Sequence, residues 1–371
     1  MRTMSDSTVA LVFGGRSSEH SISCISAAAV WDALEATGHT VLPIAVTPSG
    51  AVVRYDERPS DLRDVELPIV VEGSASVVFA TDPSIHGVLV DGEPVRVDAV
   101  FPVLHGPWGE DGTIQGLLEL AGLPYVGSGV LASALCMDKL TLKQVLQAAQ
   151  VPVTPWVPIV GDAWTRERDD LVTRIGELAP VVFVKPSRAG SSVGISRIEH
   201  TGGGTTGVDF IGALEAAIDD ARAHDPRVVV EQGMVGSREI ECAVRQDANG
   251  QVSVSVPAEI RVREGFDFYD FDAKYIADGA ELIVPADLDP RVTARIQALA
   301  ERCFRAAGCE GLARVDFFVR DEQVVVNEVN TMPGFTPISM FPRMWEASGV
   351  SYADLIDSLV GEAMSRRPGL R

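Results

Sequence analysis

The feature that most constrains this chain is a hairpin-like segment that carries acidic residues inside its apolar strands. Residues 312–340, LARVDFFVRDEQVVVNEVNTMPGFTPISM, alternate apolar and polar residues around a polar turn. This pattern predicts two short paired strands followed by an irregular loop. Folding the hairpin about residues 321–323 places Asp316 and Glu328 opposite each other on one face, and Asn330 shares that face. Two carboxylates and an amide oxygen are the hard ligands that Mg²⁺ prefers.

An alternative is that Asp316 and Glu328 are ordinary outward-facing strand residues. Two neighbours favour a site instead. Arg314 lies two residues before Asp316, so it places a fixed cation on the same face. The loop at 330–337, NTMPGFTP, is richer in turn-forming residues than a simple connection requires. A candidate metal site beside a cation and a shaped loop predicts phosphate chemistry.

The length and composition bound the class of protein. At 371 residues, with 46% hydrophobic and 22% charged residues, the chain has globular composition and room for two or three domains. It contains neither an apolar run of about 18 residues nor a recognisable secretory leader, so we expect a cytoplasmic protein. The five cysteines are scattered and odd in number, and we expect all of them to be reduced.

The charge balance narrows the partners. The formal net charge is −21, which argues against nucleic acid or an anionic membrane as a partner. Of the 31 basic residues only four are lysines: Lys139, Lys143, Lys185 and Lys274. Because the chain otherwise uses arginine, a lysine that falls inside a motif is a candidate for a specific role.

The N-terminal segment predicts a strand, a glycine turn and a helix. Residues 8–13 are apolar, 14–20 read GGRSSEH, and 22–36 form a helix that ends near Gly38. The turn is not GxGxxG, so we do not expect NAD binding. Glu19 places a carboxylate at this turn, where it could receive an ammonium group. The alternative is that Glu19 is only a favourable charge at a helix start.

A second strand end carries a histidine. Residues 99–104 predict a strand, residues 105–112 read HGPWGEDG, and a helix follows from about Thr113 to Ala121. A single histidine is often structural. His105, however, lies at the carboxyl edge of an expected α/β sheet, where ligands bind.

The middle of the chain holds candidate nucleotide contacts. A single helix is expected over 130–149, carrying Lys139, and the proline-rich segment 151–158 looks like a domain boundary. A strand at 181–184 leads into KPSRAGSSVGI (185–195), whose small residues and lysine suit a loop that covers phosphates. It lacks the Walker A pattern.

Two further segments suggest binding and closure. Residues 231–236, EQGMVG, form an exposed bend whose backbone could bond the edge of a flat heterocycle. Residues 261–285 form a long segment that contains Lys274 and Tyr275, and a loop of this length is often a lid.

Seven motifs occur in an order that is specific. They are GGRSSEHSIS (14–23), LHGPWGEDGTIQG (104–116), MDK (137–139), VKPSRAGSSVGIS (184–196), FYDFDAKY (268–275), ARVDFF (313–318) and NEVNTMPGFTPIS (327–339). Together they closely resemble the D-alanine–D-alanine ligase family of the ATP-grasp superfamily, over roughly residues 8–365.

The resemblance implies an α/β fold in three domains, with α+β character in the ATP-binding part. A Rossmann-like domain would span 1–126, a central ATP-grasp lobe 127–224, and a C-terminal lobe 225–371. The implied reaction joins two D-alanines through a D-alanyl phosphate, with ATP converted to ADP and phosphate, for peptidoglycan precursor synthesis. The implied cofactors are ATP and two Mg²⁺ ions, for which Mn²⁺ could substitute, and a homodimer is implied.

Roles are implied residue by residue. The metal ligands would be Asp316, Glu328 and Asn330. The ATP contacts would be Lys139, Lys185, Glu231, Met234, Glu239 and Lys274. The first D-alanine would meet Glu19, Ser191, Tyr275 and His105. The oxyanion would meet Arg314 and the Gly334 amide, and the second D-alanine carboxylate would meet Ser339 and Met340.

Three alternatives remain at this point. A D-alanine–D-lactate ligase would share most of these motifs, but Tyr275 favours the dipeptide because relatives of that kind alter the lid tyrosine. Another ATP-grasp carboxylate–amine ligase is disfavoured by Glu19 and Ser191 together with Tyr275. A catalytically silent nucleotide-binding protein is disfavoured because every charged position that the chemistry needs is filled.

Overall fold

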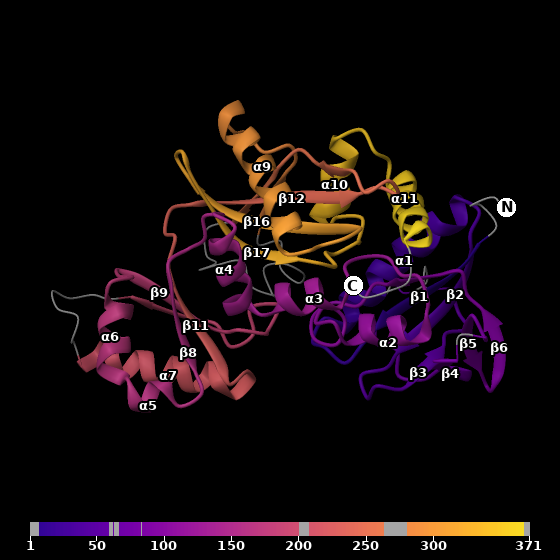
Figure 1. The fold of residues 1–371 in the computed structure, drawn as a ribbon, viewed down its shortest axis with the longest axis horizontal. Coiled ribbons are helices and arrows are strands. Elements are labelled where there is room, and N and C mark those ends of the chain that lie inside the picture. Colours follow the sequence, from indigo (N-terminus) through magenta and orange to yellow (C-terminus); the bar gives the residue numbers. More distant parts are fainter. Residues whose placement is uncertain are drawn as a thin grey trace.

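A computed structural model describes residues 7–58, 62, 67–82, 84–199, 208–262 and 280–366, and their strands form three sheets (Figure 1). The N-terminal sheet lies at one end, the second sheet at the other, and the third between and above them. None of the described helices is long and apolar enough to cross a bilayer.

The first sheet has a parallel centre with an antiparallel extension. In order across the sheet, its strands are β6 (Glu93–Arg96), β5 (Gly87–Val90), β4 (Ala75–Phe79), β3 (Val52–Arg54), β2 (Thr40–Val46), β1 (Thr8–Gly14) and β7 (Ala99–Pro102). β1 is parallel to both β2 and β7, and its almost continuous apolar sequence suits a strand covered on both faces.

Helices cover both faces of this sheet. Alternate residues of β1, among them Leu11, pack against α1 (His20–Ala36) and α11 (Tyr352–Ser365). The intervening residues, among them Val12, share a core with α2 (Thr113–Ala121). The loops that follow β1 and β7 therefore leave the sheet at neighbouring carboxyl ends, as the strand–turn–helix pattern predicted.

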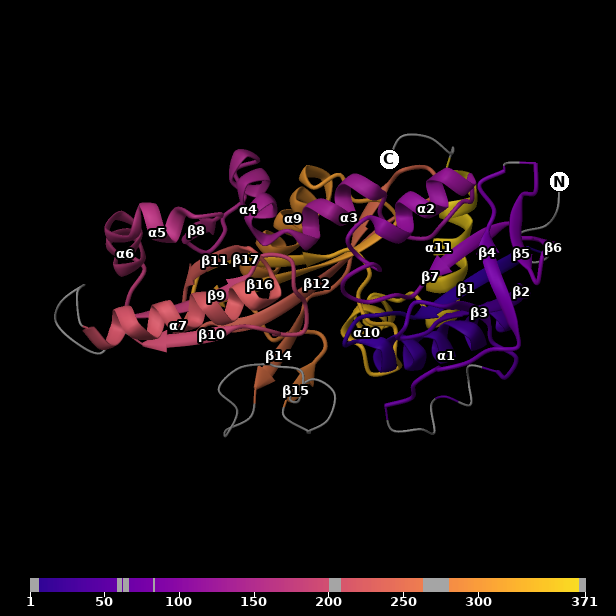
Figure 2. The ribbon, with the colours of Figure 1, turned by 90° about the horizontal axis from the view of Figure 1, so that it is seen from below.

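The second sheet is antiparallel and has its own core. Its strands are, in order, β10 (Ser196–Glu199), β9 (Val181–Pro186), β11 (Arg227–Gln232) and β8 (Trp156–Val160). Its covering helices are α5 (Ala163–Arg166), α6 (Arg168–Gly176) and α7 (Val208–His224). Figure 2 shows these helices grouped beside the sheet.

The third sheet carries the acidic hairpin. Its strands are β15 (Ala280–Ile283), β14 (Ala258–Val262), β12 (Arg238–Gln246), β16 (Leu312–Arg320) and β17 (Gln323–Asn330), with β13 (Val252–Val254) beside β12. One face packs on α9 (Pro290–Ala306), α3 (Val130–Met137) and α4 (Lys139–Ala148). α10 (Met340–Ala347) joins the core that surrounds α1 and α11.

The prediction of one helix over 130–149 is wrong, because the chain breaks at Asp138. This residue has an extended backbone (φ −87°, ψ 98°). It is both the C-cap of α3 and the N-cap of α4. Its Oδ1 accepts hydrogen bonds from the Thr141 N–H at 2.9 Å and the Ser187 hydroxyl at 2.9 Å, and its Oδ2 lies 2.8 Å from Arg227 Nε. A side chain with these partners stabilises a break that helix propensity alone does not reveal. The break places Lys139 in the first turn of α4.

The cap at Asp138 gives a first prediction. Asp138→Ala should lower the free energy of unfolding by about 2 kcal/mol, because it removes a helix cap and leaves Arg227 without its carboxylate. Asp138→Asn keeps the capping oxygen and should lose less. Differential scanning calorimetry of both variants checks this, and equal Tm values for Asp138→Ala and the parent protein would contradict it.

Candidate active site

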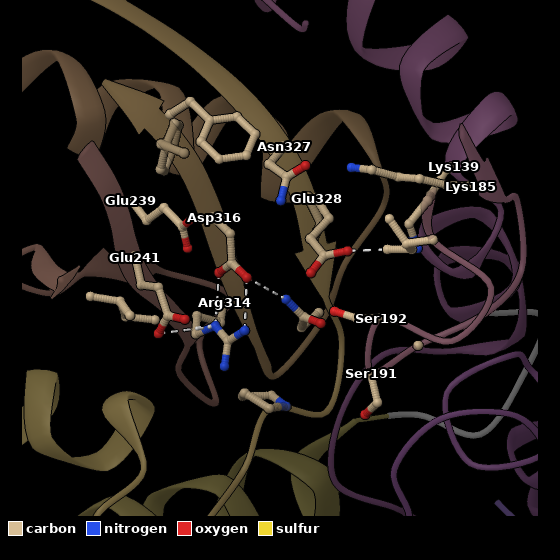
Figure 3. Close-up of a pocket in the computed structure, with 18 of the residues that line it drawn as sticks. Lys139, Lys185, Ser191, Ser192, Glu239, Glu241, Arg314, Asp316, Asn327 and Glu328 are labelled. Carbon is tan, nitrogen blue, oxygen red and sulfur yellow. Dashed lines mark hydrogen bonds and ion pairs between the residues drawn. The ribbon is translucent and has the colours of Figure 1, made fainter. Parts of the chain in front are cut away.

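The three sheets surround one large pocket, which is built from the described residues and encloses about 620 Å³. Loops of the first sheet form one wall, the β9–β10 loop forms another, and β12, β16 and β17 form the floor. A pocket of this size at a junction of domains is typical of a small-molecule site. Figure 3 shows the floor and the facing lysines.

The acidic hairpin forms as predicted, with Asp316 opposite Glu328 and Arg314 opposite Asn330. The route to this pairing differs from the prediction. The turn contains only two residues, 321–322, and the register shifts next to Asp316. Asp316 and Glu328 are 12 positions apart (328 − 316), whereas a two-residue turn pairs residues an odd number apart. The bulge at Asn327 corrects the parity and brings the two carboxylates together.

Arg314 holds the centre of this floor. Its Nε and Nη2 donate to the two oxygens of Asp316 at 2.8 and 2.7 Å, and its Nε lies 3.2 Å from Glu241 Oε2. The Asn330 amide also donates to Asp316 Oδ2 at 3.0 Å. Burial opposes the charge of Arg314, but the carboxylates of Asp316 and Glu241 outweigh it and raise the pKa well above its usual range. A permanent cation therefore lies in the pocket floor.

The donor set of the floor fits a hard metal ion. Asp316, Glu328 and Asn330 all line the pocket and offer carboxylate and amide oxygens. Within the described ranges, no group of three or more His, Cys, Asp and Glu side chains is arranged to hold a metal by itself. A metal here would thus share its coordination with Asn330, with water or with a bound phosphate, which is the usual situation for Mg²⁺.

Two lysines face this floor from the other side of the pocket. Lys139 Nζ lies 3.6 Å from Glu328 Oε2 and donates to the Ala189 carbonyl at 2.9 Å. Lys185, on β9, donates to Glu231 Oε2 at 2.8 Å. Both lysines line the pocket, so the sequence prediction of two cations near one site agrees with their positions.

Glu231 is buried between two lysines. Lys185 contacts one of its oxygens, and Lys143 contacts the other at 2.9 Å while donating to the Thr154 hydroxyl at 2.6 Å. Burial alone raises the pKa of Glu231, but the two lysine charges outweigh it and lower the pKa to about 2. The carboxylate is therefore ionised at neutral pH and fixes the direction of Lys185.

The β9–β10 loop approaches the pocket with backbone in the left-handed region. Ser191 and Ser192 have φ values of +48° and +60°, and both line the pocket. The start of the loop is fixed by Arg188, whose Nε and Nη2 donate to Asp225 at 3.0 and 2.7 Å. Non-glycine residues in this region carry backbone strain that is common at ligand-binding loops.

Glu19 and His105 lie together at the first-sheet wall. Gly106 has a φ of +72°, which favours glycine, and a Cβ added to it would be 2.8 Å from Glu19 Oε2, so the two loops approach closely. Glu19 Oε2 also lies near Gly190 of the β9–β10 loop. His105 contacts the Met332 carbonyl through Nδ1 at 3.0 Å and the Ser26 hydroxyl through Nε2 at 3.3 Å. Burial lowers the pKa of His105, so the imidazole is neutral and donates to Met332 through Nδ1.

The remaining predicted residues differ in their positions. Met234, Glu239 and Gly334 line the pocket. Ser339 and Met340 are not among the lining residues, and the Met340 side chain is buried in the core. Ser339 lies directly behind Gly334, since a Cβ on Gly334 would be 2.8 Å from the Ser339 hydroxyl.

The predictions for Lys274 and Tyr275, and for most of the lid segment 261–285, fall outside the described residues.

Three charged residues at or beside the pocket were not predicted from the sequence to have a role there. Lys143 lies one helical turn after Lys139 and is buried against Glu231, and the scarcity of lysine was the signal that could have indicated it. Glu241 lines the pocket beside Arg314.

The third, Glu110, accepts hydrogen bonds from the Gly106 N–H at 2.8 Å and the Met332 N–H at 3.1 Å. It thereby connects two loops that are distant in sequence.

Comparison with known proteins gives a consistent result. The model of the D-ala D-ala ligase N-terminus matches residues 8–128, and the model of the D-ala D-ala ligase C-terminus matches residues 145–361. A D-alanine–D-alanine ligase from Nocardia farcinica is 48% identical, and one from a Mycobacterium species (strain KMS) is 49% identical. In each case 98% of both chains is covered.

Solved structures agree with the sequence relatives. The D-alanine–D-alanine ligase of Coxiella burnetii superposes with a TM-score of 0.80 at 33% identity, covering 98% of this chain and 95% of that one. VanG D-Ala:D-Ser ligase from Enterococcus faecalis gives a TM-score of 0.83 at 34% identity, covering 96% and 99%. Near-complete coverage by sequence and by structure shows that the chain belongs to the D-alanine–D-alanine ligase family, whose fold is that of the ATP-grasp proteins.

Proposed function

We propose that this protein joins two D-alanine molecules to give D-alanyl-D-alanine, with conversion of ATP to ADP and phosphate, as a step in making peptidoglycan precursors. The observation that carries the proposal is the pocket itself. Its acidic floor around Arg314 faces Lys139 and Lys185 in a chain that matches such ligases over 98% of its length. Phosphoryl transfer needs this combination of positioning and charge neutralisation rather than a protein nucleophile.

The nucleotide would lie between the second and third sheets. Lys139 and Lys185 would contact its phosphates, the backbone near Met234 its adenine, and Glu239 its ribose. Both oxygens of the Glu231 carboxylate pair with lysines, so we propose that Glu231 orients Lys185 rather than contacting the nucleotide itself. Asp316, Glu328 and Asn330 would hold two Mg²⁺ ions, or Mn²⁺ in their place, and bound metal would supply charge neutralisation at the transferred phosphoryl group.

The first D-alanine would bind with its ammonium group at Glu19, close to Ser191 and to the neutral His105. Its carboxylate would attack the γ-phosphate of ATP to form an acyl phosphate. The amine of the second D-alanine would then attack this carbonyl and expel phosphate. Arg314 and the Gly334 N–H would stabilise the oxyanion that develops in that step.

The second D-alanine carboxylate would be held by Ser339 and by the start of α10. Because the Met340 side chain is buried, only its backbone N–H, in the first helical turn, could serve. Lys274 and Tyr275 keep the lid roles that the sequence suggests, as contacts to the γ-phosphate and to Ser191.

The proposed domains are 1–126, 127–224 and 225–371. The first sheet falls within 1–126 and the third within 225–371, whereas the second sheet includes β11, which lies beyond the proposed boundary at 224. Helices α3 and α4 lie at the junction, because they also pack on the third sheet. A homodimer and a cytoplasmic location complete the proposal, the first supported by the family relationship and the second by the free, buried cysteines.

A second candidate function is ligation of D-alanine to D-serine, because one similar solved structure is a D-Ala:D-Ser ligase. The test is ADP release by the purified protein with Mg-ATP and D-alanine alone, with added D-serine, or with added D-lactate, with products identified by mass. We expect D-alanine alone to support release and to give the dipeptide. A D-serine or D-lactate product formed in preference would keep the ATP chemistry and change the second substrate.

Arg314 gives a prediction for the chemical step. Arg314→Ala should still bind ATP, although more weakly because Asp316 and Glu241 lose the cation between them, and should lose about 10²–10³-fold in kcat because one oxyanion donor is removed. Arg291→Ala, which removes an exposed arginine remote from the pocket, is the matched control. The measurements are steady-state kinetics and calorimetric ATP binding. Turnover of Arg314→Ala near that of the control would exclude Arg314 from the mechanism.

Glu110 gives a prediction about pH. Burial and the nearby charge of Glu19 raise the pKa of Glu110 to about 8, against the opposing influence of its two N–H donors and Arg314. An acid whose pKa is raised by folding binds its proton more tightly in the folded state. The stability that this proton contributes is complete below the unfolded pKa of about 4.5 and is lost as pH rises towards 8.

Glu110→Gln should therefore gain Tm relative to the parent protein as the pH is raised from 6 to 9. Thermal unfolding at several pH values measures this difference. A constant difference in Tm across that range would show that Glu110 is already ionised in the folded protein.

A further inference from the structure

Three carboxylates lie in a row across the pocket floor. Glu241 on β12 is directly opposite Asp316 on β16, and Asp316 is directly opposite Glu328 on β17. Like charges at adjacent cross-strand positions repel each other. Glu241 is the most buried of the three, with a side chain that is 6% exposed, compared with 14% for Asp316 and 29% for Glu328. A buried carboxylate is costly unless a cation or hydrogen-bond donor compensates its charge.

Arg314 is shared between two members of this row. Its guanidinium makes two hydrogen bonds with Asp316, and its Nε also lies 3.2 Å from Glu241. In Figure 3 the guanidinium lies between these two carboxylates, while Glu328 points towards the lysines. One cation thus has two anchors, on adjacent strands.

The two carboxylates that hold Arg314, Asp316 and Glu241, have different roles in the proposed reaction. Both oxygens of Asp316 already accept from Arg314, and Oδ2 accepts from Asn330 as well. A carboxylate has about four lone-pair sites, and Asp316 already accepts three hydrogen bonds, so metal ligation by Asp316 competes with its bonds to Arg314. When Asp316 holds Mg²⁺, its bonds to Arg314 weaken, yet Arg314 has to stay beside the reacting carbonyl. A second anchor for Arg314 resolves this conflict.

We propose that Glu241 is the positioning residue that supplies this second anchor. It holds the Arg314 guanidinium when Asp316 turns to the metal, so Mg²⁺ binding and oxyanion stabilisation are compatible. Glu241 touches neither the metal nor the substrate in this role; it acts through Arg314. The inference rests on the proposed function, because it takes Asp316 as a metal ligand and Arg314 as the oxyanion donor.

A simpler explanation is that Glu241 only balances the charge of Arg314 and so stabilises the fold. That explanation predicts a lower Tm without a change in the Mg²⁺ requirement. Glu362, near the end of α11, provides a matched control, because its buried carboxylate lies 2.6 Å from Nε of Arg366, the residue that follows this helix, outside the pocket.

The test compares Glu241→Gln, Glu241→Asp and Glu362→Gln with the parent protein. Calorimetric titrations with ATP, at Mg²⁺ concentrations from micromolar to millimolar, give the Mg²⁺ concentration that half-restores ATP affinity. Glu241→Gln confines Arg314 to Asp316, so this concentration should rise about tenfold, the lower end of the usual effect of outer partners on a metal site. In Glu241→Asp the carboxylate is kept but lies one methylene further back, so the required Mg²⁺ concentration should rise less. For Glu362→Gln the required Mg²⁺ concentration should equal that of the parent.

Kinetics provide a second readout. At saturating Mg²⁺, Asp316 is engaged with the metal, so in Glu241→Gln the Arg314 guanidinium has lost both anchors. We therefore expect kcat to fall at least tenfold while KM for D-alanine changes little, because a poorly positioned Arg314 affects the transition state rather than substrate binding. Should Glu241→Gln fail to fold, the Glu241→Asp series carries the same comparison.

Asp316→Asn distinguishes an error about the role of Glu241 from an error about the proposed metal site. If Asp316→Asn shifts the Mg²⁺ requirement and Glu241→Gln does not, the role of Glu241 is wrong and the proposed metal site stands. If neither variant shifts it, the metal site itself is wrong. Equal losses of Tm for Glu241→Gln and Glu362→Gln with an unchanged Mg²⁺ titration would leave Glu241 with a structural role only.

Discussion

The pairing of Arg314 with the carboxylates around it is the interaction on which the pocket depends. Without a cation, three carboxylates on adjacent strands would repel each other in a partly buried position. With Arg314 among them, the same strands can present negative charge to the pocket and remain paired. The two lysines on the facing wall complete the balance, since Lys139 lies 3.6 Å from Glu328. The floor can thus be acidic enough for a metal and still contain a donor for an oxyanion.

Much of this arrangement could be predicted from the sequence, because it follows strand periodicity. The alternation in residues 312–320 fixes which side chains of β16 share a face, and the predicted pairing of Asp316 with Glu328 is confirmed. The turn was placed correctly but was assigned one residue too many. The bulge does change the spacing of the apolar residues, because the core positions Val324 and Val326 are two apart and the next, Val329, is three further on. That change of spacing was the signal in the sequence that was missed.

Other features depend on contacts between distant segments, and a single sequence does not reveal them. The helix break at Asp138 is stabilised by Arg227 and Ser187, which lie 89 and 49 positions further along the chain. The burial of Glu231 between Lys143 and Lys185 joins two strands and a helix in the same way. Local propensity has no access to such partners. The family resemblance supplied residue roles but not these supports, which is why Lys143, Glu110 and Glu241 were missed.

The cores of the molecule have a consequence for how the pocket could open. One core, which includes Leu11, Phe335 and Trp345, runs from the helices of the first sheet to α10 and the edge of the third sheet. The second sheet has a separate core around α7 and β9. The wall with Glu19 and the floor with Arg314 therefore belong to one continuous body, while the β9–β10 loop belongs to another. Swinging the second sheet away would expose the nucleotide side of the pocket and withdraw Ser191 without breaking either core, while the position of Glu19 relative to Arg314 would persist through each cycle of entry and release.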